Sequence, residues 1–421
     1  MSDEFTKGIL REHTEEATFL WTRRTLLAQA PHCYLASLTG WDDRLDAHLD
    51  GLELEPDLGW SVLETALLWE NAEELFVGAR LAFRSNDRAW INRVLAIIGE
   101  NTSPVPGVIS ALGWLPYSEA GAHIRWLVQS GSPALRRVGI AGYAIHRQNP
   151  GDTLRDSLRS EDLLLKARAC KAVGELGRSD LASQTSLAMP SEDALVRFWS
   201  AWSTALLTGS ANALSVLESI AESPGPRQIQ AMQMLARRAP AETKDWQRKL
   251  AQNPQHLRLA LIAAGESGDP APVPFLIEKM KVPPLARVAG EAFTTITGVD
   301  LSREHLDGKK PEGFEAGPND NPEDENVAMD EDEDLPWPEP ALVQKWWERN
   351  RSQFQNGTRY LLGKPMTTDW LRTVLRDGRQ RQRAAAALEL AIRNPGQPLF
   401  NVKAPGFRQI EALGKPGPVI R

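Results

Sequence analysis

An arginine followed by an alanine-rich run recurs at a nearly constant spacing in the middle of this chain. Between residues 132 and 298 successive arginines lie 31, 29, 30, 31 and 29 residues apart, and they are Arg137, Arg168, Arg197, Arg227, Arg258 and Arg287. A fixed period of this length is typical of helical repeat proteins, in which one unit is one pair of helices. A single pair cannot bury its own apolar face, so neighbouring pairs must stack. The sequence therefore predicts an all-α fold built as a helical-repeat solenoid.

The residues around Arg168 show how one unit is built. Gly177 is placed to end the first helix, because glycine tolerates the left-handed conformation found at helix ends, and Asp180 is placed to cap the next helix. An arginine near the start of each pair resembles HEAT repeats, in particular the short kind related to bilin-lyase repeats. That resemblance implies an α-α superhelix. The face that must be buried carries apolar side chains at helical spacing, namely Leu164, Leu165, Ala169, Ala172, Val173 and Leu176.

Changes in pattern divide the chain into four expected regions. Residues 1–59 form a helical N-terminal cap, with one long amphipathic helix from residue 4 to about residue 29 that Pro31 ends. Residues 60–300 carry the HEAT-like repeat array, and residues 301–340 form an acidic, proline-rich loop. Residues 341–421 hold the last repeat and a tail rich in proline and glycine. We expect this tail to lie extended over the last repeat.

The loop of residues 301–340 concentrates the acidity of the chain. Residues 311–340 contain twelve acidic residues, no lysine or arginine, and few apolar residues. No core offsets the entropy cost of ordering such a segment, so its composition predicts disorder. Because the whole chain has a net charge of −7, the remainder without these twelve acids carries about +5. The loop either covers a basic patch on its own solenoid, steers a basic partner, or is a solvated insertion, which composition favours.

Composition also narrows the possible classes of protein. The chain is 42% hydrophobic and 24% charged, and no apolar run reaches the about 18 residues that a membrane span requires. Its N-terminus lacks the basic and apolar regions of a signal peptide. Cys33 and Cys170 lie far apart among apolar neighbours and predict two buried free thiols. We therefore expect a cytoplasmic protein without membrane contact.

Motifs for nucleic-acid binding and catalysis are missing from the sequence. The basic run at residues 376–383 leads directly into an alanine-rich helix, and the chain as a whole is acidic, which disfavours nucleic acid as a partner. The sequence contains no phosphate loop, nucleotide-binding glycine motif, nucleophile elbow or zinc-binding histidine pair. Its seven histidines are scattered without the spacing of metal ligands. We expect no catalytic residue, no cofactor, no metal and no enzymatic activity.

Four short segments near the two ends resemble one particular family. They are residues 47–52 (AHLDGL), 362–365 (LGKP), 378–384 (GRQRQRA) and 404–409 (APGFRQ). Together with the repeat layout they are similar to uncharacterised bacterial HEAT-repeat proteins that are commonly encoded in type VI secretion gene clusters. The resemblance implies a scaffold or adaptor that holds a secreted effector, a spike or an accessory protein, and it carries no catalytic residues. An immunity-type inhibitor of a toxin and a lyase-like or modifying enzyme remain as alternatives.

Candidate contact residues follow from the geometry of HEAT-like stacks, in which the second helix of each pair lines the inner face. Exposed polar positions on these helices, the acidic run and a paired indole are the expected protein-binding residues: Arg155, Arg159, Gln184, Glu218, Gln247, Arg248, Glu278, Lys279, Asp330, Glu331, Asp332, Glu333, Asp334, Trp346 and Trp347. The repeat arginines are expected to be structural and to bind between neighbouring repeats: Arg168, Arg197, Arg258, Arg287 and Arg383.

Overall fold

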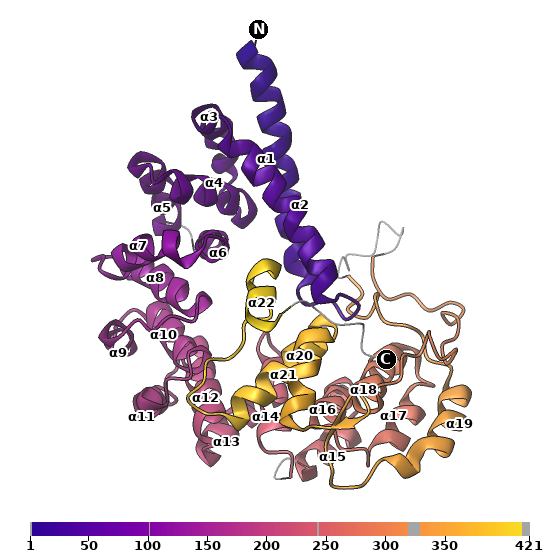
Figure 1. Cartoon of the computed structure of the whole chain (residues 1–421). Helices are drawn as coiled ribbons and strands as arrows, with labels where there is room; N and C mark the ends of the chain where they lie inside the picture. The colour runs from indigo at the N-terminus through magenta and orange to yellow at the C-terminus, as the bar shows by residue number, and fades with distance from the viewer. Residues whose placement is uncertain (1, 101, 242–243, 319–328, 415–421) are drawn as a thin grey trace. The chain divides into compact units, whose positions relative to one another are not determined.

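The all-α fold predicted from the repeat is confirmed by a computed structural model of the chain (Figure 1). The structure describes residues 2–100, 102–241, 244–318 and 329–414. In these ranges it contains 22 α-helices and one β-hairpin. The two strands of the hairpin have two residues each, and β1 (Tyr360–Leu361) pairs antiparallel with β2 (Lys364–Pro365). No helix of this part of the chain is long and apolar enough to cross a membrane.

The contacts within the chain divide it into two compact units. The first unit comprises residues 2–213 and 391–414, and the second comprises residues 214–390. The N-terminal cap belongs to the first unit because its long helix packs on the helices that follow it.

In the first unit, each even-numbered helix from α4 to α10 packs against the next even-numbered helix. Helix α4 contacts α6, α6 contacts α8, α8 contacts α10, and α10 contacts α12, while α7, α9 and α11 pack beside them. This is the stacking that a pair of helices with one apolar face requires. The bounds are α1 (Ser2–Leu27), α2 (Leu35–Glu53), α3 (Pro56–Ala66), α4 (Ala72–Ser85), α5 (Arg88–Glu100), α6 (Val105–Trp114), α7 (Tyr117–Val128), α8 (Pro133–Ile145), α9 (Asp152–Leu158), α10 (Leu163–Glu175), α11 (Ala182–Ser186) and α12 (Ala194–Thr208).

The second unit continues the same arrangement. Helix α16 contacts both α14 and α18, with α15 and α17 packed alongside. The apolar faces of α16, α17 and α18 form one core that includes Phe293, Ile296 and Leu276, each with no exposed surface. The bounds are α14 (Gln228–Arg238), α15 (Lys244–Gln252), α16 (Leu257–Ser267), α17 (Val273–Lys279), α18 (Pro283–Thr297), α19 (Pro340–Asn350), α20 (Thr368–Asp377) and α21 (Gln380–Arg393, whose last turn is in the first unit); α13 (Ala211–Glu222) crosses the boundary between units.

The repeat arginines mark the beginning of every second helix. Arg137, Arg168 and Arg197 lie in the first two turns of α8, α10 and α12. Arg227 is the residue before α14, and the last two of the series lie near the starts of α16 and α18. The period read from the sequence is therefore the period of the helix pairs. One detail differs, because Leu164, assigned to the buried face, is 39% exposed at the start of α10.

Helix α1 is the long N-terminal helix that the sequence predicts, and Figure 1 shows it lying along α2. Leu10, Ala17 and Leu20 are buried on one side of it. Trp21 stacks on Phe76 with ring centroids 5.4 Å apart, which joins α1 to α4. Burial of this side alone fixes the cap to the first helices of the array.

The C-terminal tail is held against the first unit, where we had expected it to cover the last repeat. The amide of Leu399 donates to the carbonyl of Glu175 at 3.0 Å, and the guanidinium of Arg147 donates to the carbonyl of Leu399. Gly177 has φ +64, and a Cβ on it would lie 2.4 Å from the carbonyl oxygen of Gln397, so only glycine fits this crossing. The tail ends in a further helix, α22 (Gly406–Leu413), which packs on α2.

His146, which lies near the charge of Arg408 in the tail, couples stability to pH. Nε2 of His146 lies 2.8 Å from the carbonyl oxygen of Leu112 and donates to it. Burial, followed by the nearby charge of Arg408, lowers the pKa of His146 from 6.5 to about 4. Between these values the unfolded chain binds a proton that the folded chain does not, so stability falls as pH falls.

We expect the free energy of unfolding to fall by about 2 kcal/mol more between pH 7 and pH 4.5 in the wild type than in His146→Gln. Urea denaturation of the two proteins at both pH values measures this difference. Equal losses in the two proteins would contradict the assigned role of His146.

Cys33 and Cys170 are both buried free thiols, as predicted. Burial raises the pKa of the Cys170 thiol to about 12, which keeps it in the unreactive protonated form.

Candidate functional site

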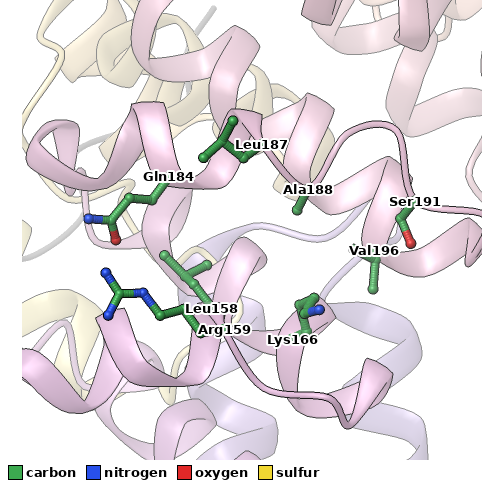
Figure 2. A pocket seen from close by; sticks show the side chains of 8 residues that line it. All are labelled: Leu158, Arg159, Lys166, Gln184, Leu187, Ala188, Ser191 and Val196. Atoms are coloured by element: carbon green, nitrogen blue, oxygen red, sulfur yellow. The ribbon is translucent and has the colours of Figure 1, made fainter.

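An open pocket of about 420 Å³ lies between four consecutive elements of the first unit, α9 to α12 (Figure 2). Leu158 and Val196 are buried and form its apolar floor. Arg159 and Gln184, two of the predicted contact residues, line it from α9 and α11, and Figure 2 shows their polar ends near one another. Its lining residues are Leu158, Arg159, Lys166, Gln184, Leu187, Ala188, Ser191 and Val196.

Leu187 gives this pocket an apolar rim that solvent reaches. It follows the five-residue helix α11 and is 81% exposed. Lys166 and Arg159 supply positive charge at the same opening. The combination of an apolar floor, an exposed leucine and cationic side chains suits an amphipathic peptide segment with acidic residues.

The wall of the pocket is fixed by caps and by one repeat arginine. Asp193 accepts a hydrogen bond from the amide of Val196 at 2.8 Å and so caps α12. Arg197 donates to the carbonyl of Ser191 at 3.2 Å and to that of Glu192 at 3.4 Å. This arginine therefore holds the turn that forms one edge of the pocket.

The acidic run meets the repeat arginines of the second unit. Asp332 is 5% exposed and accepts two hydrogen bonds from Arg258, each of 2.7 Å. Asp330 pairs with Arg287, whose guanidinium also lies 4.5 Å from the centre of the Trp337 ring. Hydrogen bonding to Asp332 is the main cause that raises the pKa of Arg258.

This contact corrects the expectation of disorder for residues 329–340. Three carboxylates of the run, Asp330, Glu331 and Asp332, pair with two arginines that lie two helices apart. Charge complementarity therefore orders a segment that composition alone would leave disordered. Of the open alternatives, the structure supports a segment that covers a basic patch on its own chain. Glu331, Glu333 and Asp334 remain exposed. The expected disorder at residues 319–328 lies outside the described residues.

Trp346 and Trp347, predicted as contact residues, pack into the core of the second unit instead. Trp347 is 8% exposed and lies 5.4 Å from the ring of Phe354. Trp346 meets Phe293 edge to face at 5.7 Å. The paired indoles were misread because α19 is partly covered by α17, a contact that the local sequence does not reveal.

The remaining predicted contact residues do not form one site. Arg155 pairs with Asp152, Arg248 with Asp245, and Lys279 with its neighbour Glu278, each within one helix or its first turn. These residues lie on four helices that are distributed over the two units. They are Arg155 (α9), Glu218 (α13), Gln247 and Arg248 (α15), and Glu278 and Lys279 (α17). Arg159 and Gln184 alone line the pocket described above.

The partners of the repeat arginines differ from those expected. Arg168 pairs with Glu175 at 2.9 Å in its own helix, and Arg383 is fully buried and donates to the carbonyl of Leu375 at 2.7 Å. Burial acts most strongly on Glu175 and opposes its ionisation. Arg168 with two other cations outweighs it and lowers the pKa of Glu175 to about 2. The partners of these arginines lie in their own helix, in the turn or helix just before it, or in the acidic run.

Sequence reasoning missed Leu187 and Lys166. A leucine two residues before the Met189-Pro190 turn was the available signal, because an apolar side chain at a helix end is exposed unless a neighbour covers it. No group of three or more histidine, cysteine or carboxylate residues suited to a metal ion occurs among the residues that the structure describes.

Comparison of the chain with protein-family models, with curated proteins and with solved structures finds no match in any of the three.

Proposed function

We propose that this chain is a non-catalytic protein-binding adaptor that holds a partner through the pocket between α9 and α12. The observation that carries the proposal is the 81% exposed Leu187 beside an apolar floor and the cationic side chains of Arg159 and Lys166. A stacked array supports this use, because it keeps such a surface rigid before binding. The partner segment is amphipathic and acidic, since that chemistry matches both parts of the pocket.

The setting of this adaptor follows from the resemblance of the two chain ends to HEAT-repeat proteins of type VI secretion gene clusters. In that setting the partner is a secreted effector, a spike or an accessory protein, and the adaptor acts in the bacterial cytoplasm before export. An adaptor of this kind needs no cofactor, metal, nucleic acid or membrane.

The experiment is an affinity purification of tagged protein from cells that produce it naturally. We expect Leu187→Asp to reduce recovery of the partner at least about tenfold, because burying a leucine in a contact contributes about 1.5–3 kcal/mol. Leu54→Asp is the matched control, since Leu54 is also 81% exposed in the first unit. It should retain the partner.

Each outcome distinguishes between functions. If the wild type and Leu54→Asp recover an effector or spike component and Leu187→Asp does not, the result supports the adaptor. Recovery of a single toxin whose activity the chain abolishes supports the immunity-type inhibitor. Equal recovery by both variants would contradict binding at this pocket.

A further inference from the structure

One side of α1 carries a stripe of apolar side chains that the described residues of the first unit leave exposed. Phe5 is 73% exposed, Ile9 41%, Phe19 54% and Leu26 57%. At about 100° per residue these four positions fall within one arc of about 100°, on a different side from the residues buried against α2, α3 and α4. The end of a repeat array is normally polar, so such a stripe indicates a contact surface.

The stripe has the spacing of a coiled-coil seam. Steps of four and three residues lead from position 5 through 9, 12, 16, 19, 23 and 26, which gives the sequence Phe5, Ile9, Glu12, Glu16, Phe19, Arg23 and Leu26. Glu12, Glu16 and Arg23 are exposed with the apolar members. Charged residues in the middle of the seam make it a poor membrane-binding surface and favour a partner that supplies opposite charges.

We propose that this stripe pairs antiparallel with the same stripe of a second copy of this chain. With the twofold axis between residues 17 and 18, Ile9 lies opposite Leu26 of the other copy, and Glu12 lies opposite Arg23. Glu16 lies opposite Phe19. Each contact occurs twice, because a twofold interface is self-complementary.

Charge decides between the two directions of pairing. In a parallel pair each stripe residue meets its own copy, so Glu12 meets Glu12, Glu16 meets Glu16 and Arg23 meets Arg23. Like charges placed opposite each other destabilise such an interface. The antiparallel register replaces two of these repulsions with Glu12–Arg23 pairs and places Ile9 opposite Leu26, while Phe5 lies beyond the end of the other copy's α1. The pairing rests on α1 alone and is independent of the proposed function.

The backing of α1 keeps the stripe ready for pairing. Arg24 and Asp42 join α1 to α2 at 2.8 Å, and Leu20 is fully buried beneath it. The N-terminal turns of α1 extend past the neighbouring helices (Figure 1). Little conformational freedom is therefore lost on association.

Sedimentation equilibrium of the full chain, from about 1 to 100 µM at low salt, tests the pairing. We expect a monomer–dimer equilibrium in the wild type and a dissociation constant at least about tenfold higher in Arg23→Glu and in Glu12→Arg, because each change places like charges opposite one another twice. An equimolar mixture of the two variants should restore the wild-type constant, since each then supplies the charge that the other needs. Arg11→Glu is the control, because this exposed residue lies outside the stripe.

A wild type that stays monomeric at 100 µM would overturn the proposal. So would a dimer that both single variants leave unchanged, since the contact would then lie elsewhere, or a mixture that stays as weak as the single variants. Circular dichroism melting of each variant at low concentration should match the wild type, which separates loss of pairing from loss of fold.

Discussion

Glu389→Ala is expected to lower the free energy of unfolding of the second unit by about 3–5 kcal/mol. Glu389 is 1% exposed and pairs with Arg237, at 3.3 Å, and with Arg359. Arg237 is 2% exposed and also pairs with Glu266. Removing one carboxylate leaves two arginines with one acidic partner in a site that excludes water, so an uncompensated positive charge stays buried. Urea denaturation followed by circular dichroism measures the loss.

The neutral variant Glu389→Gln should lose less than the alanine variant, because its amide oxygen still accepts a hydrogen bond. Glu348→Ala, at an exposed position of α19, should change the free energy of unfolding by no more than about 0.5 kcal/mol. If Glu389→Ala were as stable as Glu348→Ala, the ion network would have no structural role.

Arg24→Ala is expected to have a similar effect on the first unit, with a loss of about 3–5 kcal/mol. Arg24 pairs with Asp42, which is 1% exposed, and donates to the carbonyls of Lys403 and Ala404 at 2.7 Å. Asp42 in turn accepts the amide of Gly406 at 2.6 Å. One guanidinium thus joins α1, α2 and the C-terminal tail, and its loss leaves the buried carboxylate of Asp42 without its cationic partner and removes a donor from each of the two carbonyls.

Two readouts separate this loss from a general weakening of the fold. Burial already raises the pKa of Asp42, and without Arg24 it should rise further. The folded variant then binds a proton more readily than the unfolded chain. The difference in free energy of unfolding between the wild type and the variant should therefore shrink as pH falls toward 4. Limited proteolysis should cut residues 394–405 faster in Arg24→Ala than in the exposed control Arg11→Ala. Equal cutting would contradict the role of Arg24 in holding the tail.

Local pattern was enough to predict much of the fold. The spacing of the repeat arginines placed the starts of α8, α10, α12, α16 and α18, because helix pairs of similar length must return to the same position in the stack. Thr367 accepts the amide of Trp370 at 3.2 Å and caps α20, as the preference for threonine at helix starts predicts. Two of the eight residues that line the pocket, Arg159 and Gln184, were among the predicted contact residues.

Long-range contacts explain what local pattern could not predict. Composition gives the net charge of the acidic run but not the positions of Arg258 and Arg287, which pair with it 74 and 43 residues away. The tail shows the same limit, since Arg24 lies 380 residues from the carbonyl of Ala404 to which it donates. Leu187 was missed because its exposure depends on a lack of contacts. Helix α11 is short, and the described side chains at the pocket rim leave Leu187 exposed.

Hydrogen exchange of the purified chain, alone and with the protein recovered by affinity purification, tests the adaptor most directly. We predict that the partner slows exchange at residues 154–196, which carry the pocket, and leaves the buried ion network around Glu389 unchanged. If the complex forms but exchange at residues 154–196 is not slowed, the central claim that this pocket binds the partner is contradicted.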